Sequence, residues 1–132
     1  MKTPADHVRF LVPAVLCYAA DIGVTLAGQP AEYWAGDYAA VHEINPLARA
    51  LLKTHPMLFL AAATAWAAVF TILIVYWRYG AWVAVALTVG HTVGAATWLV
   101  RIGPWGWLLA VAYLAAVSQF ARRCWRGGRK KR

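Results

Sequence analysis

Long apolar stretches separated by short polar connections dominate this chain. Four of them contain no charged residue apart from Asp21 in the first, and they cover Phe10–Gly28, Pro56–Trp77, Tyr79–Val100 and Ile102–Ala121. A helix that crosses a bilayer needs about 20 predominantly apolar residues at 1.5 Å rise per residue. The pattern therefore predicts an all-α integral membrane protein with four transmembrane helices.

The connection Gln29–His55 is the only long one between these stretches. Asn45 followed by Pro46 indicates a helix start, because Asn caps free backbone N–H groups and Pro is pre-set for the first helical position. We expect Pro46–Lys53 to form a short amphipathic helix at the membrane interface, between the first and second spans. The sequence Thr54-His55-Pro56 predicts a break before the second span, because a residue that precedes proline avoids the helical region.

Composition agrees with a membrane location and with a single domain. The chain has 132 residues, of which 62% are hydrophobic and 14% are charged, too apolar for an ordinary soluble domain. We therefore expect one four-helix transmembrane domain over residues 1–121 and a basic cytoplasmic tail over residues 122–132.

Basic residues set the expected orientation, because they are enriched on the cytoplasmic side of spans. With four spans, the side that carries both termini holds Lys2, Arg9, Arg78, Arg122, Arg123, Arg126, Arg129, Lys130, Lys131 and Arg132, and the other side holds Arg49, Lys53 and Arg101. Both termini are thus expected in the cytoplasm.

Most of the formal charge of +8 comes from the seven basic residues of the tail, from Arg122 to Arg132. A basic cluster beside a span attracts anionic lipid headgroups, at about 1 kcal/mol per residue near the surface. We therefore expect these residues to bind membrane lipids, and no nucleic acid partner is needed to explain them.

Two polar residues inside the apolar stretches, Asp21 and His91, provide the main functional clue. A charge at the centre of a span costs about 2.5–3.5 kcal/mol on insertion scales, so such a residue needs a partner. Helical rise places Asp21 about 10 Å and His91 about 15 Å below the outer surface. Side chains bridge this difference, and Thr25 lies one turn above Asp21. A shared buried polar site is predicted.

A divalent-metal site is the first interpretation of this polar group. Asp21, His42, Glu43 and His91 supply carboxylate and imidazole ligands suited to zinc or a related ion. An open coordination position would allow hydrolysis of a lipid or peptide, but no catalytic residue can be named and enzyme activity stays undecided. Thr25, Asn45 and Trp98 are expected to have structural or substrate-binding roles.

Three other interpretations stay open. Asp21, Glu43 and Asn45 can form a purely structural lock. Alternatively, the protein is a proton-coupled small-solute transporter, which requires a homo-oligomer built through the small-residue stripe Ala86, Gly90 and Gly94. It can also be an accessory subunit of a membrane complex, in which His91 ligates a haem or chlorin.

Short motifs resemble an uncharacterised family of short prokaryotic multi-pass membrane proteins. The resemblance rests on Asp21-x-x-x-Thr25, on Glu43-x-Asn45-Pro46 and on a histidine in a later helix, and it covers Asp21 to about Leu52. It implies a four-helix fold, a prokaryotic inner membrane location and these motif residues as the family pattern, but no substrate.

Overall fold

The computed structural model describes residues 4–126, and this part of the chain is all-helical. Its four long helices are α1 (Pro4–Ala27), α4 (Pro56–Tyr76), α5 (Gly80–Leu99) and α6 (Gly106–Arg126). The short elements are α2 (Ala31–Trp34), η1 (Tyr38–Ala40), α3 (Pro46–Thr54) and η2 (Val100–Ile102). The predicted all-α fold class is confirmed.

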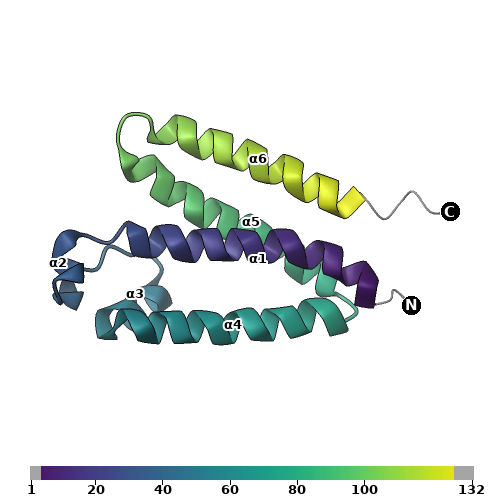
Figure 1. The fold of residues 1–132 in the computed structure, drawn as a ribbon, viewed down its shortest axis with the longest axis horizontal. Helices are drawn as coiled ribbons and strands as arrows, with labels where there is room; N and C mark the ends of the chain where they lie inside the picture. Colours follow the sequence, from purple (N-terminus) through teal and green to yellow (C-terminus); the bar gives the residue numbers. More distant parts are fainter. Residues whose placement is uncertain (1–3, 127–132) are drawn as a thin grey trace.

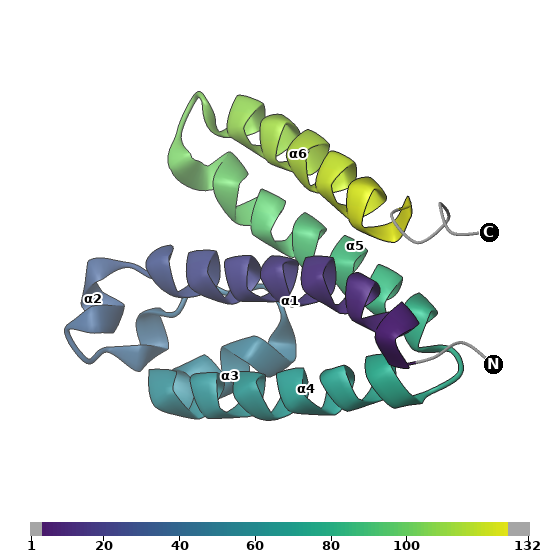
Figure 2. The same cartoon turned by 45° about the vertical axis from the view of Figure 1, so that its right-hand side comes forward.

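Helix α1 is the central helix of the bundle. It packs against α4, α5 and α6, and its most extensive contact is with α5. The start of α1, the end of α6 and the turn between α4 and α5 lie at one end of the molecule (Figure 1). The short elements α2 and α3 and the connection between α5 and α6 lie at the opposite end, which Figure 2 shows from a second direction.

Three helical segments are long and apolar enough to cross a membrane. They are His7–Ala27, Pro56–Tyr76 and Gly80–Ile102, which correspond to the first three predicted spans. Helix α6 differs from the predicted fourth span because it starts only at Gly106, after Gly103 with φ of 114° and the following Pro104. Helix α6 also continues past Ala121 and includes Arg122, Arg123 and Arg126 at its end. The fourth span stays a prediction.

The predicted break between the amphipathic segment and the second span is confirmed. Helix α3 ends at Thr54, His55 is extended with φ of −173° and ψ of 139°, and α4 starts at Pro56. The Nδ1 atom of His55 accepts a hydrogen bond from the Met57 N–H at 3.1 Å and so caps α4. Because the backbone turns at His55, α3 folds back beside α4 instead of extending it (Figure 2).

A buried cluster of Tyr33, Val41, Leu52 and Phe59 fixes the connection against the end of the bundle. The Tyr33 side chain is 0% exposed, and its hydroxyl donates a hydrogen bond to the Leu52 carbonyl at 3.1 Å. Burial, with the neighbouring Tyr38 as a second cause, raises the pKa of Tyr33 above its usual value. The connection is therefore a packed cap on the bundle.

Gln29 ties the start of this connection to its later part. Its side-chain amide donates to the carbonyls of Thr25 and His42, at 2.8 and 3.2 Å, and its side-chain oxygen accepts from the His42 N–H at 2.9 Å. Gln29 is buried, so these bonds satisfy polar groups that water does not reach.

The predicted boundary between domain and tail falls inside α6, because this helix continues through Arg122 and Arg123 to Arg126. The remaining basic residues of the predicted tail, Arg129, Lys130, Lys131 and Arg132, lie outside the described residues.

Candidate functional site

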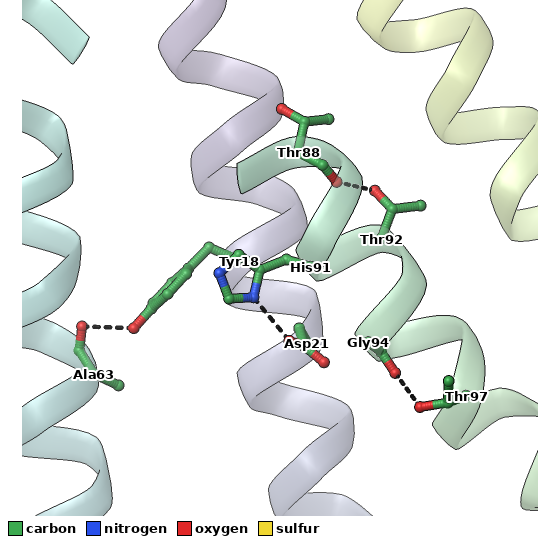
Figure 3. Close-up of polar contacts among 8 residues, drawn as sticks. All are labelled: Tyr18, Asp21, Ala63, Thr88, His91, Thr92, Gly94 and Thr97. Atoms are coloured by element: carbon green, nitrogen blue, oxygen red, sulfur yellow. Dashed lines mark hydrogen bonds and ion pairs between the residues drawn. The ribbon is translucent and has the colours of Figure 1, made fainter. Parts of the chain in front are cut away.

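Asp21 and His91 form a direct pair between the two helices that pack most closely. Asp21 lies on α1 and His91 on α5, and the distance between Asp21 Oδ2 and His91 Nδ1 is 2.8 Å (Figure 3). Their side chains are 18% and 24% exposed, respectively. The predicted approach of these residues is confirmed, and the pair offsets the cost of placing each polar group among apolar helices.

Gly94, one turn after His91 on α5, makes room for this pair. A Cβ at Gly94 would lie 2.7 Å from both carboxylate oxygens of Asp21. The small-residue stripe of α5 was expected to admit a second helix backbone, but at Gly94 it admits the carboxylate. Gly90, in the same stripe, would place a Cβ in open space.

Tyr18 holds the pair from the other side. Its ring meets the His91 ring edge to face, with centroids 4.6 Å apart, and its hydroxyl donates to the Ala63 carbonyl of α4 at 2.8 Å (Figure 3). Tyr18 thus links α1 to α4 and restricts the imidazole of His91. Sequence reasoning missed this residue, although its position three residues before Asp21 places it on the same face of α1.

A cavity of about 500 Å³ lies beside the pair. Its walls come from α1, α4 and α5, and α3 with the loop before it lines one end. The polar lining residues are Asp21, Thr25, Glu43, Asn45, His91 and Thr97, and the aromatic ones are Tyr18, Phe59, Trp66, Phe70 and Trp98. One cavity thus combines a polar centre with extensive aromatic surface.

The lining of this cavity carries acidic residues but no lysine or arginine among its described residues. Asp21 and Glu43 are its carboxylates and His91 is its histidine. Trp66 and Gly90 line the cavity and are also exposed at the protein surface. Asn45 and Leu47, at the α3 end of the cavity, are exposed lining residues as well, so the cavity is open to the surface of the bundle.

Glu43 and Asn45 contribute to the cavity and also organise the start of α3. The Glu43 Oε1 accepts from the Asn45 N–H at 2.7 Å. The Asn45 Oδ1 accepts from the N–H groups of Leu47 and Ala48, at 3.0 and 3.3 Å. The predicted helix start at Asn45 is confirmed, and the carboxylate beside it faces the same cavity as Asp21.

Thr25 and Trp98 both line the cavity and are buried. The Trp98 ring packs over Gly28, where a Cβ would lie 2.4 Å from two ring carbons. The guanidinium carbon of Arg101 lies 4.7 Å from the centroid of the Trp98 ring. These contacts fix the position of the Trp98 ring in the cavity wall.

The structure does not assemble the four predicted metal ligands. Asp21 and His91 are in contact and Glu43 lines the same cavity, but His42 is exposed, does not line it and is held through its backbone by Gln29. Among residues 4–126, no group of three or more His, Cys, Asp or Glu side chains is arranged to hold a metal ion. Metal binding stays a prediction.

Comparison with known proteins gave no match. No protein-family model matches the chain, and neither a curated protein nor a solved structure does. The resemblance carried by Asp21, Thr25 and the Glu43-x-Asn45-Pro46 segment stays a prediction. The site is therefore interpreted from its own geometry.

Proposed function

We propose that this protein binds a hydrophobic organic cation in the cavity between α1, α4 and α5. The observation that carries this proposal is the lining itself, which holds two carboxylates, one histidine and five aromatic rings, without a lysine or arginine among its described residues. Arg101 already lies over one of these rings, Trp98, so the other four are the ones offered to a ligand. An ammonium group suits the carboxylates, and aromatic faces attract cations with about 0.5–2 kcal/mol each. A volume of about 500 Å³ is also within the usual range for small-molecule sites.

The proposal places the cavity inside a membrane, with α6 as the fourth span and both termini in the cytoplasm. Residues 106–121 of α6 measure about 24 Å at 1.5 Å per residue, and Arg122 and Arg123 can extend their charges to the interface. An even number of spans agrees with the start of α1 and the end of α6 lying at one end (Figure 1). The exposed Arg49 and Lys53 and the buried Leu52 support an interfacial position for α3.

A ligand would enter sideways from the lipid. Trp66 on α4 and Gly90 on α5 line the cavity and are exposed, which supports an opening between these helices, and the exposed lining residues Asn45 and Leu47 offer a second one beside α3. A hydrophobic cation dissolved in the bilayer would reach Asp21 through the opening between α4 and α5.

An ammonium group of a bound cation would contact the carboxylate of Asp21, which in the free protein contacts His91. A proton-coupled small-solute transporter, the alternative function, would use the same cavity. Four short helices enclose little volume, so we expect transport only from a homo-oligomer.

The test uses two probes of similar shape and opposite charge, tetraphenylphosphonium and tetraphenylborate. Binding to the detergent-purified protein is measured by calorimetry and by quenching of tryptophan fluorescence. We expect the cation to bind, the borate to bind at least tenfold more weakly, and Asp21→Asn to weaken cation binding at least tenfold. The matched control is Asp37→Asn, because Asp37 is exposed and outside the cavity lining. Equal binding of both probes, or unchanged binding by Asp21→Asn, would overturn the proposal.

A divalent metal is the second candidate, supported by the contact of Asp21 with His91 and by Glu43 in the same cavity. Elemental analysis after purification with added zinc separates it from the first. Stoichiometric zinc that is lost in both Asp21→Asn and His91→Gln would favour the metal site, whereas zinc at background level in the parent protein would exclude stable zinc binding.

A further inference from the structure

A second cavity, of about 360 Å³, lies between α5 and α6 on the side of α5 away from Glu43 and the first cavity. Half of its lining residues are aliphatic, including Val89 and Val93 of α5 and Leu114 and Val117 of α6. The cation site does not use any of these residues. We call this second cavity the α5–α6 groove.

The threonines of the groove do not offer free hydroxyl groups to a polar ligand. Thr88 donates to the Ala84 carbonyl at 2.7 Å, and Thr92 donates to the Thr88 carbonyl (Figure 3). Both hydroxyls are thus satisfied within α5, and the middle of the groove presents mainly methyl and methylene groups. Such a surface suits a hydrocarbon chain.

One end of the groove is basic and aromatic. Arg122 and Trp125 line it there, and the Trp125 ring stacks on Phe10 of α1 with centroids 6.1 Å apart. Arg123 and Arg126 lie on the same last turns of α6. A guanidinium group binds phosphate through two parallel hydrogen bonds, so this end suits an anionic headgroup.

The dimensions match one leaflet of a bilayer. Leu114 and Arg122 are eight residues apart on α6, about 12 Å along the helix axis. This is close to half of a hydrocarbon core about 30 Å thick, with the basic end at the cytoplasmic interface. A second copy of the chain fits less well, because it would bring its own arginines against Arg122.

We propose that the α5–α6 groove binds one acyl chain of an anionic phospholipid from the cytoplasmic leaflet, with its phosphate at Arg122. The inference rests on α6 as the fourth span of the proposed topology, but not on cation binding. The basic residues at the end of the chain can also attract anionic headgroups without the groove. Non-specific attraction and binding in the groove predict that different variants lose lipid retention.

The experiment measures retention of phosphatidylglycerol, against phosphatidylcholine with the same chains, by native mass spectrometry and by thermal stabilisation in detergent. We expect selective retention of phosphatidylglycerol, about tenfold weaker in Arg122→Gln. The control Arg126→Gln removes the same charge from the same end without touching the groove lining, and we expect it to weaken retention threefold or less. Val89→Phe fills the groove at an exposed position and should also weaken retention about tenfold without a change in charge.

Equal losses in Arg122→Gln and Arg126→Gln together with normal retention by Val89→Phe would show general surface attraction and overturn the groove site. Equal retention of both lipids would overturn it as well. Binding of tetraphenylphosphonium in the same samples reports on the first cavity separately, so failure of one proposal is not mistaken for failure of the other.

Discussion

The carboxylate of Asp21 on α1 lies directly against Gly94 of α5, where a Cβ would come within 2.7 Å of both oxygens. This contact explains how a polar side chain is accommodated between two closely packed apolar helices. The absent side chain at Gly94 leaves the space in which Asp21 reaches His91.

Gly94→Ala should therefore displace Asp21 from His91. We expect a loss of about 1–3 kcal/mol in the free energy of unfolding, because an inserted methyl group in a packed region forces shifts of its neighbours. Thermal unfolding in detergent, together with cation binding, measures the effect. The control is Gly23→Ala on α1, where a Cβ meets nothing within 4 Å and a helical alanine is neutral or slightly stabilising. Equal stability of both variants would show that the contact at Gly94 is loose.

Substitutions at Asp21 separate its structural role from its charge. Asp21→Asn keeps a hydrogen bond to His91, so its unfolding transition should stay close to that of the parent protein while cation binding is lost. Asp21→Leu leaves the imidazole without this partner and should cost about 1–3 kcal/mol of stability. If Asp21→Leu unfolds like the parent, the pair does not lock α1 to α5.

Glu43 should contribute to cation binding without being essential for folding. Glu43→Gln keeps a side-chain oxygen that accepts from the Asn45 N–H, so the start of α3 should survive. We expect tetraphenylphosphonium affinity to fall about threefold to tenfold, measured by calorimetry. The matched control is Glu32→Gln, an exposed residue of α2 outside the cavity lining. Equal effects of the two variants would point to general surface charge.

Gln29 should determine how firmly the cap sits on the bundle. Gln29→Leu leaves the backbone N–H of His42 without its acceptor, and we expect a stability loss of about 1–3 kcal/mol. Hydrogen exchange should accelerate at His42 and in α3 but not in α5. Gln119→Leu, at an exposed position of α6, is the control. Unchanged exchange at His42 in Gln29→Leu would contradict this role.

The proposed topology is tested by cysteine labelling of intact cells. With Cys17→Ala and Cys124→Ser as the background, single cysteines at Asp37 and Trp105 should react with an impermeant maleimide from outside. A single cysteine at Arg126 should react only after permeabilisation, because α6 then crosses the membrane. Labelling of the Trp105 and Arg126 positions from the same side would show that α6 does not span, and would remove the basis for the groove site.

Local sequence signals were sufficient for the existence of the four long helices and of α3, and for the identity of the polar pair, but not for the short helix α2 or the start of α6. The apolar runs predict the three membrane-capable helices, Asn45-Pro46 predicts the start of α3, and His55-Pro56 predicts the break before α4. The number of residues between each polar residue and the end of its helix predicted that Asp21 and His91 lie at similar depth, because helical rise is fixed at 1.5 Å per residue. These features depend on backbone chemistry and distance along one helix, which the sequence contains directly.

Tertiary structure alone decided which faces of the helices meet. Helix α4 has no charged residue or histidine and α5 has only His91, so the sequence does not indicate which of their other sides contact protein and which contact lipid. The roles of Gly94 and Tyr18, the exclusion of His42 and both cavities therefore appear only when the helices are packed. The late start of α6 is indicated by Gly103-Pro104, which are typical of a turn. The predicted span included these two residues, because hydropathy does not depend on backbone conformation. The sequence determined the long helices and the buried polar residues Asp21 and His91. Packing decided the cavities between the helices, since each cavity is lined by side chains that lie far apart in the chain.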